Sequence, residues 1–327
     1  MERQFTVGLA AGERVDAMFA LRIKEMRASR TGEAYLSLEF GDRAGAIGGI
    51  MFRPSREAES IPTGTVVHVR GTVTTYRGVL RVSVETMRPA GRYDLRDIMP
   101  SGPRDSDEML EELRGHVRAL HDRGLGLLVR SVFADREFMT RFKSCPATRA
   151  VHHAYIGGLL EHTVAVAGIC RTMADLYPQV DADLLLAGAL LHDIGVVDTL
   201  EFQTSIELTD TGRLLGAPVL GERRLTAALA GSTMVPPQVV DQLAHMMLSH
   251  EGSATDGPLC PRTLEATVLA AAHALDARSA QYIAVGQRAG SVGESWTIEG
   301  SRALQPRTVS SAAVRGSGRL PQYARSA

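Results

Sequence analysis

The sequence has few cysteines, few aromatic side chains and no long apolar run. Its three cysteines, Cys145, Cys170 and Cys260, are odd in number and far apart, which excludes a disulfide framework and a CxxC zinc site. We expect them to be small core residues. No apolar run approaches the roughly 18 to 20 residues that cross a bilayer, and 44% hydrophobic with 22% charged residues is typical of a soluble globular protein.

Residues 1–16 also lack the uninterrupted apolar segment of a secretory signal peptide, because charged side chains divide them. We therefore expect a cytoplasmic protein without a membrane anchor.

The net charge of −1 hides an uneven distribution. Residues 1–92 hold 14 basic and 10 acidic side chains, residues 93–284 hold 16 and 25, and residues 285–327 hold 6 and 2. Basic ends around an acidic middle are compatible with an anionic polymer held by the ends and metal cations held in the middle. An ordinary solvated surface explains the same counts.

The spacing of apolar residues divides the chain into regions. Five short β-like runs within residues 12–90, separated by Gly-containing turns, predict a small barrel or sandwich. Residues 91–108 are rich in Pro, Gly, Asp and Ser and predict a linker, with Ser106 as the N-cap of the first helix. Apolar residues then recur three and four apart and predict an all-α domain. The predicted units are 1–92, the linker 93–107, the all-α domain 108–285 and a disordered basic tail 286–327.

Eight of the ten histidines follow residue 120. A lone histidine on an apolar helix is more often a satisfied core residue than a ligand. Here, however, four separate helical segments carry one, and the apolar run 184–198 contains His192 and Asp193. Burying an unpaired imidazole and carboxylate costs several kcal/mol each, so either a metal ion or a buried salt bridge must compensate. Imidazoles and carboxylates converging from several helices are typical of metal sites in all-α folds.

Three motifs carry a family resemblance. HHAYIGGLLEHT (152–163), LLAGALLHDIG (185–195) and HMMLSHEG (245–252) resemble the HD superfamily of metal-dependent phosphohydrolases, and most closely the YhaM-type 3′-5′ exoribonucleases. YDLRDIMPS, TDTGRLLG and LEATVLAAAHALDA follow in the family's order, so the resemblance covers most of residues 12–285. It implies a small all-β OB-type barrel, which binds nucleic acid, followed by an all-α HD domain.

The resemblance implies that His162, His192 and Asp193 are metal ligands and that His245 and His250 complete the shell of a second ion. Asp193 is the natural bridge, since a carboxylate can bind two cations whereas an imidazole donates one nitrogen at a time. Two divalent ions roughly 3.5 to 4 Å apart hold a phosphodiester and lower the pKa of a bridging water. His152 and His153 would contact substrate phosphate, with simple packing or capping as an equal alternative.

The sequence departs from the family at three positions. Val196, Ala217 and His273 stand where the family has Lys, His and Asp. A neutral His273 can still bind a first-row metal but adds no negative charge, so Mn, Co, Fe or Zn should be favoured over Mg. Asp276, one helical turn further along, is an alternative ligand.

The barrel carries aromatic and basic residues that suit a single strand. Phe52 and Tyr76 are predicted to stack on bases, and Arg53, Arg77 and Arg81 to supply positive charge. The alternative is that Phe52 lies in the core and the arginines form a solvated surface. The resemblance implies RNA, with single-stranded DNA as the alternative strand. It also implies a homo-oligomer, although no interface is visible in the sequence.

These observations favour a metal-dependent 3′-5′ exoribonuclease-like phosphodiesterase in which the barrel grips single-stranded RNA and the HD site hydrolyses it. Two alternatives stay open. One is an HD-type phosphohydrolase that acts on small nucleotides, and the other is a nucleic-acid-binding protein whose catalysis is weakened by the three departures.

Overall fold

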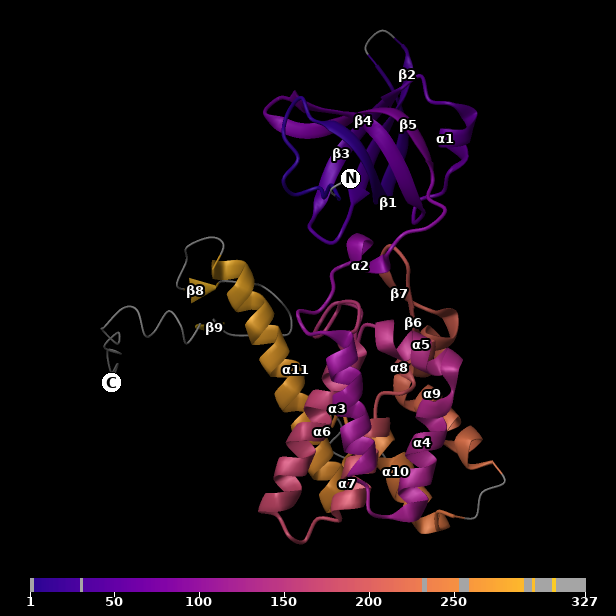
Figure 1. Cartoon of the computed structure of the whole chain (residues 1–327), viewed down its shortest axis with the longest axis vertical. Helices are drawn as coiled ribbons and strands as arrows, with labels where there is room; N and C mark the ends of the chain where they lie inside the picture. The colour runs from indigo at the N-terminus through magenta and orange to yellow at the C-terminus, as the bar shows by residue number, and fades with distance from the viewer. Residues whose placement is uncertain are drawn as a thin grey trace, which may run out of the picture.

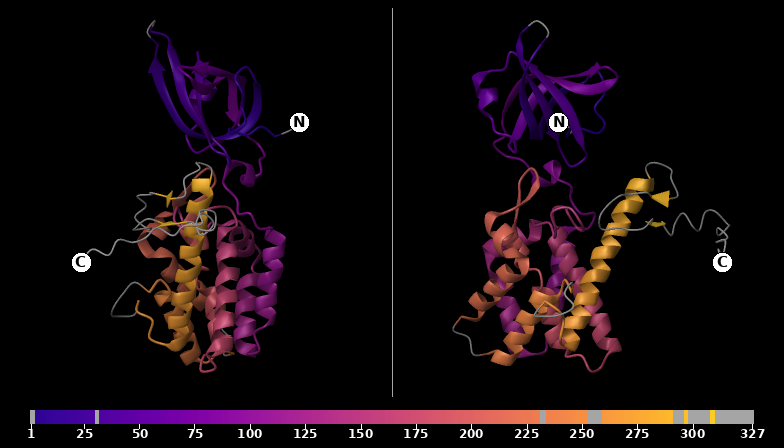
Figure 2. Two further views of the ribbon diagram at one scale, coloured as in Figure 1. Left: turned by 90° about the vertical axis from the view of Figure 1, so that its left-hand side faces the viewer. Right: turned by 180° about the vertical axis from the view of Figure 1, so that it is seen from behind.

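The computed structural model describes residues 3–29, 32–230, 234–252, 259–290, 296–297 and 308–309. Figure 1 shows a β-barrel at one end of the long axis and a helical domain at the other, and Figure 2 shows the same division from two further sides. No helix in these ranges combines the length and the apolar character needed to cross a membrane.

The barrel is closed by five strands. They are β1 (Arg14–Ala28), β2 (Ala34–Gly41), β3 (Ala46–Phe52), β4 (Val66–Tyr76) and β5 (Val79–Pro89), with the short helix α1 (Arg56–Ser60) between β3 and β4. The order is β1-β2-β3-β5-β4, with β3 and β5 parallel. β1 is long enough to pair with both β2 and β4, and a register shift between Leu21 and Ile23 bends it. The predicted five-stranded OB-like barrel is confirmed.

A linker joins the barrel to the helices, and it contains the short helix α2 (Leu95–Ile98). Apolar side chains from three parts of the chain are buried together there: Ala20 and Val66 from the barrel, Ile98 and Met99 from the linker, and Ile156 from the helical domain. The two domains are therefore in direct apolar contact.

The helical domain consists of α3 (Ser106–Arg118), α4 (Arg123–Ala134), α5 (Arg136–Ser144), α6 (Gly158–Leu176), α7 (Ala182–Leu191), α8 (Val196–Thr199), the hairpin β6 (Leu200–Phe202) and β7 (Ile206–Leu208), α9 (Asp210–Leu229), α10 (Pro237–Ser249) and α11 (Leu264–Gly290). The predicted N-cap Ser106 is wrong. Asp105 caps α3 instead, because its carboxylate accepts hydrogen bonds from the backbone N–H groups of Asp107 and Glu108.

Helix α7 forms the centre of this domain. Every residue from Leu184 to Leu191 is buried, as expected for a helix that is apolar on all sides. It packs against α4, α6, α10 and α11, so a residue at its end is surrounded by other helices.

Two further predictions concern the cysteines, expected in the core, and the tail, expected to be disordered. Cys145 and Cys170 are buried free thiols, whereas Cys260 is only half-buried. Most of the predicted disordered tail, 286–327, lies outside the described residues. Within it, residues 286–290 continue α11, and the two-residue strands β8 (Trp296–Thr297) and β9 (Thr308–Val309) pair with each other. The unit boundaries 1–92, 93–107 and 108–285 stay a proposal.

Candidate metal centre

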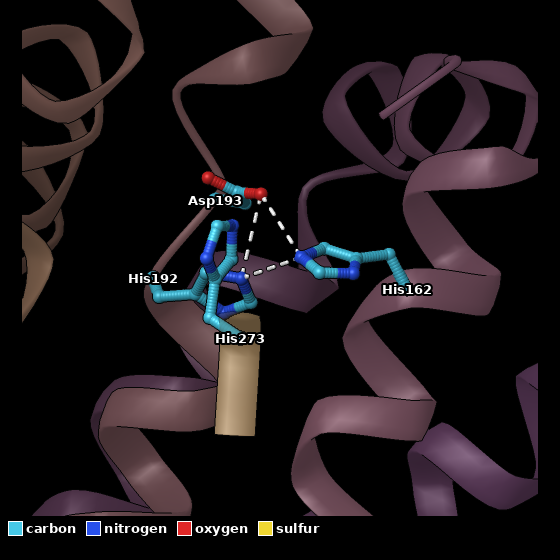
Figure 3. Close-up of side chains that lie close together, drawn as sticks. All are labelled: His162, His192, Asp193 and His273. Carbon is cyan, nitrogen blue, oxygen red and sulfur yellow. Dashed lines mark hydrogen bonds and ion pairs between the residues drawn. The ribbon is translucent and has the colours of Figure 1, made fainter. Parts of the chain in front are cut away.

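Side chains from three helical regions converge in the helical domain. His162 lies in the first turns of α6, His192 and Asp193 directly follow α7, and His273 lies within α11. Each offers one ligand atom, and these four atoms all lie within 4.8 Å of one another (Figure 3). The three residues that the sequence offered as first ligands are thus brought together with His273.

Hydrogen bonds fix which nitrogen of each ring faces the cluster. Nδ1 of His192 lies 2.8 Å from the carbonyl oxygen of Ala189, and Nδ1 of His250 lies 2.7 Å from that of Met247. A carbonyl can only accept, so Nδ1 carries the proton in both rings. In a neutral ring this leaves the lone pair of Nε2 for a ligand role, and a bound cation favours that form.

His162 is held in the same way by a carboxylate. Its Nδ1 lies 2.6 Å from Oδ2 of Asp276. Burial would raise the pKa of Asp276, but hydrogen bonds from His153 and His162 outweigh it and hold that pKa well below its usual value. The ionised carboxylate only accepts, so Nδ1 of His162 donates and Nε2 is free to bind a metal. Metal-binding histidines commonly have such a carboxylate partner.

The distances fit one first-row ion. The Nε2 atoms of His162 and His192 are 3.2 Å apart, and two neutral rings with Nδ1 protonated share no proton there. Oδ2 of Asp193 lies 3.5 Å from the first nitrogen and 3.4 Å from the second. Two nitrogens that bind one ion at about 2.0 to 2.1 Å are themselves roughly 3 Å apart. A cation between these three atoms would turn an unfavourable contact of lone pairs into a ligand set.

The second oxygen of Asp193 points to another histidine. Its Oδ1 lies 3.3 Å from Nε2 of His250, which is 2% exposed. Burial would raise the pKa of Asp193, but His192 and His250 outweigh it by charge and hydrogen bonding and lower it well below its usual value. Asp193 is thus an ionised carboxylate with histidines on both oxygens, which is the arrangement a bridging ligand requires.

His273 brings no charge to this cluster. Its ring centre is 5.0 Å from that of His162 and 4.8 Å from that of His250. Burial lowers the pKa of His273 to about 2, so the ring is neutral at neutral pH. Asp276, the alternative ligand, lies behind His162 and is engaged by its Nδ1.

The two neighbouring histidines of the first motif have different surroundings. Both ring nitrogens of His153 are engaged, Nε2 by Asp276 at 2.8 Å and Nδ1 by the hydroxyl of Tyr155 at 2.8 Å. Nδ1 of His152 is buried and has no hydrogen-bond partner among the described residues. Burial lowers the pKa of His152 to about 4. Of the two, only His152 has a free nitrogen for a substrate.

His245 lies apart from the cluster. Its Nε2 accepts a hydrogen bond from the backbone N–H of Arg262 at 2.9 Å, and it is not among the converging ligand atoms found in the described ranges.

The other two departures from the family lie near Asp193. Val196 is buried, 5% exposed. Ala217 follows Gly216, whose φ of 75° kinks α9, and a Cβ on Gly195 would meet the carbonyl oxygen of Ala217 at 2.1 Å. Position 217 therefore packs against the turn after Asp193, but alanine offers no ligand atom.

The barrel residues singled out in the sequence lie in two clusters on the barrel surface. Phe52 and Tyr76 are each 51% exposed, which contradicts the alternative that Phe52 lies in the core. The ring of Phe52 contacts Tyr35, its partner across β2 and β3, at 5.7 Å. The guanidinium of Arg81 lies 4.3 Å from the centre of the Tyr76 ring, and that of Arg77 lies 5.4 Å away.

Strand register places these two clusters at opposite ends of one outer face. Ile50 aligns with Ser83 across β3 and β5, and Tyr76 aligns with Val79 across β4 and β5. Phe52 thus lies about six residues, or about 20 Å, from Tyr76 along the strands. Arg53 follows Phe52 and forms an exposed ion pair of 2.9 Å with Glu33.

A closed barrel followed by helices that enclose a His–Asp centre defines a two-domain protein of the HD class, and the HD domain family model matches residues 159–278. The 3′-5′ exoribonuclease YhaM of Shouchella clausii (strain KSM-K16) is 30% identical over 272 residues, 82% of this chain and 84% of that protein. YhaM of Bacillus subtilis (strain 168) is 30% identical over 273 residues, 82% of this chain and 86% of that protein. The chain therefore belongs to the YhaM family of 3′-5′ exoribonucleases.

Among solved structures, a chain of a replication protein A heterotrimer bound to single-stranded DNA matches 26% of this chain at 21% identity and a TM-score of 0.22.

Two residues of the site, Tyr155 and Glu161, were not predicted from the sequence. Tyr155 and Glu161 both lie in the first histidine motif, and the Tyr155 hydroxyl donates to Oε2 of Glu161 at 2.9 Å. The sequence does place Tyr155 between His153 and His162, and Glu161 directly before His162. These positions could have indicated a role at the site.

Proposed function

We propose that the protein is a metal-dependent 3′-5′ exoribonuclease that hydrolyses single-stranded RNA from its 3′ end, with single-stranded DNA as the alternative strand. The observation that carries the proposal is the 3.2 Å approach of two Nε2 atoms, from His162 and His192, beside ionised Asp193 in a chain of the YhaM family. A cytoplasmic location and a homo-oligomeric state belong to the same proposal.

His162, His192, Asp193 and His273 would hold the first ion, and Asp193 with His250 would hold a second. When bound, such ions polarise the phosphodiester and supply a hydroxide at neutral pH. Hydrogen bonds from Nδ1 of His192, His250 and His162 to Ala189, Met247 and Asp276 direct each Nε2 toward the cluster.

The remaining site residue suited to substrate is His152. With a pKa of about 4 its ring is neutral at neutral pH, and its unpartnered Nδ1 can exchange a hydrogen bond with a phosphate oxygen or an attacking water. His153 is proposed to orient Asp276, since both its nitrogens are engaged.

The donor set bears on the identity of the metal. Three imidazoles and one carboxylate around the first ion give fewer charged oxygen ligands than Mg prefers. Imidazole suits first-row transition ions, so Mn, Co, Fe or Zn is proposed in preference to Mg.

The barrel is proposed to hold the strand. Phe52 and Tyr76 offer exposed rings about 20 Å apart, a span of a few nucleotides, and Arg53, Arg77 and Arg81 lie beside them. Stacking and backbone charge are tolerant of sequence, as a degradative enzyme requires.

The test is digestion of a 5′-labelled single-stranded RNA with Mn or Co supplied. We expect a ladder that shortens from the 3′ end, release of mononucleotides and no such products with Asp193→Ala. Absence of product from the wild-type protein, or undiminished activity in Asp193→Ala, contradicts the proposal.

The ligand-free residue at position 217 and the displaced His245 favour a second candidate, a nucleic-acid-binding protein with weakened catalysis. It predicts RNA binding that weakens steeply with salt, together with an empty metal site. A phosphohydrolase of small nucleotides instead predicts that turnover of a mononucleotide is unchanged in the double variant Phe52→Ala, Tyr76→Ala.

A further inference from the structure

A chain of short hydrogen bonds runs from the metal ligand His162 away from the metal. Asp276 accepts from Nδ1 of His162 at 2.6 Å and from Nε2 of His153 at 2.8 Å, through the same oxygen Oδ2. Nδ1 of His153 lies 2.8 Å from the hydroxyl of Tyr155, which lies 2.9 Å from Oε2 of Glu161. Each link depends on the position of the one before it.

The backbone holds this chain in place. His153 has a φ of 46°, an uncommon left-handed conformation for a residue with a side chain. A Cβ on Gly158 would meet the carbonyl oxygen of His153 at 2.0 Å, so the loop lies directly against the start of α6. Because surrounding structure must enforce such a conformation, the ring of His153 has little freedom to move independently of that loop.

Tyr155 and Glu161, at the far end of this series of hydrogen bonds, contact the interdomain linker. The backbone N–H of Ile156 donates to the carbonyl of Pro100 at 2.9 Å, and that of Gly102 donates to the carbonyl of Ile156 at 3.3 Å. A Cβ on Gly102 would lie 2.7 Å from the ring of Tyr155 and 2.8 Å from Oε2 of Glu161. Gly102 is therefore packed against both residues, and a side chain there would displace them.

The same linker carries the barrel. Ile156, next to Tyr155, is buried with Met99 of the linker and with Ala20 and Val66 of the barrel. A continuous set of contacts thus connects the barrel, the linker, Tyr155 and His162.

We propose that Tyr155 is a positioning residue that ties the interdomain linker to the metal ligand His162, acting through His153 and Asp276. This inference rests on the metal centre of the proposed function. Burial raises the pKa of Tyr155 above that of an ordinary tyrosine, so its hydroxyl keeps its proton at neutral pH and donates it to Glu161.

Two substitutions test the proposal from opposite sides. Tyr155→Phe keeps the ring against the linker and removes both hydroxyl contacts. Gly102→Ala keeps the hydroxyl and forces a methyl group against the ring. The matched controls are Tyr177→Phe, at an exposed position after α6, and Gly115→Ala, where a Cβ would meet nothing within 4 Å.

The measurement is titration of the metal-free full-length protein with Co²⁺, followed by its visible absorption, which reports ligand geometry. Removing a direct outer partner of a metal-binding histidine costs about 10- to 100-fold in affinity, so we expect that loss for Asp276→Asn and about 3- to 10-fold for Tyr155→Phe and Gly102→Ala. The spectra of these two variants should change, whereas both controls should match the wild type. Circular dichroism at the titration temperature shows whether each variant is folded.

Wild-type affinity and spectrum in both Tyr155→Phe and Gly102→Ala overturn the inference while Co²⁺ binding by the wild-type protein leaves the proposed metal centre intact. If the wild-type protein binds no Co²⁺, the metal centre and this inference are both overturned. A variant that is destabilised but keeps the wild-type spectrum identifies Tyr155 as structural and also contradicts the proposal.

Discussion

The two domains differ in how far their buried polar side chains are satisfied by the protein itself. In the described part of the barrel region, the buried polar residues are Thr6 and Asp42, and Asp42 is satisfied by Thr6, Ala44 and Gly45. The helical domain buries His162, His192, Asp193 and His250. The protein supplies partners for one nitrogen of each of these rings and leaves the other nitrogen facing the cluster.

The two domains therefore depend on different interactions. A buried polar group that has protein partners is stable without a ligand, whereas buried groups that face one another without a shared proton need an added cation. The barrel should therefore be indifferent to metal, and the helical domain should respond to it. Substitutions or conditions that affect only one domain test this difference.

The largest effect is expected when one histidine from each domain is replaced. His162→Ala removes a proposed ligand, and His68→Ala removes a half-exposed barrel histidine that is paired with Asp16 at 2.5 Å. Metal catalysis supplies several kcal/mol, and 1.36 kcal/mol is a factor of ten, so we expect about a thousandfold loss of RNA hydrolysis in His162→Ala. His68→Ala should keep wild-type activity in the same assay. Equal losses in both variants would remove the distinction between the domains.

Acid should destabilise the metal-free helical domain more than the barrel. Burial lowers the pKa of His152 to about 4 and that of His273 to about 2, against about 6.5 in the unfolded chain. A depressed histidine pKa means that the unfolded chain takes up more protons, so stability is complete above pH 6.5 and falls as pH decreases below it. At pH 5 each residue costs about 2 kcal/mol.

Part of that loss is offset by His250, because its hydrogen bond to Asp193 outweighs burial and raises its pKa. Hydrogen exchange of the metal-free protein at pH 7 and pH 5, after correction for intrinsic exchange rates, should show loss of protection in α6, α7 and α11 and unchanged protection in β1 and β4. Earlier loss in the barrel would contradict the contrast.

The smallest effect is expected at the barrel surface. Phe52→Ala and Tyr76→Ala should each weaken RNA binding by about 1 kcal/mol or more, roughly fivefold, and leave metal content unchanged. Met26→Ala, also an exposed apolar residue of the barrel, is the control and should bind RNA as the wild type does. Fluorescence anisotropy with labelled single-stranded RNA measures the effect, and unchanged affinity in both aromatic variants would show that this face does not hold the strand.

The spacing of apolar residues predicted the elements whose structure depends on neighbouring residues alone. The alternation of β4 and β5 gave the hairpin, and the apolar run of α7 placed His192 and Asp193 in the core. Exposure of Phe52 was open in the sequence, because a residue at the end of a strand has no following alternation to fix its face.

The partners of His162 were beyond such a pattern. Asp276 is 114 residues away, and its role depends on how α11 approaches α6. The sequence partly indicates that His245 and His250 do not face the same cluster, because residues five apart on a helix differ by about 140° in direction. His250 lies beyond the end of α10 and turns toward Asp193, whereas His245 points to Arg262.

Elemental analysis of the purified protein and of Asp193→Ala shows whether a metal ion compensates the buried cluster. We expect at least one transition-metal ion per chain in the wild-type protein, two if Asp193 and His250 hold a second ion, and none in the variant. A wild-type protein that holds no metal after growth and dialysis with Mn or Co, or a variant that holds as much as the wild type, would contradict this expectation.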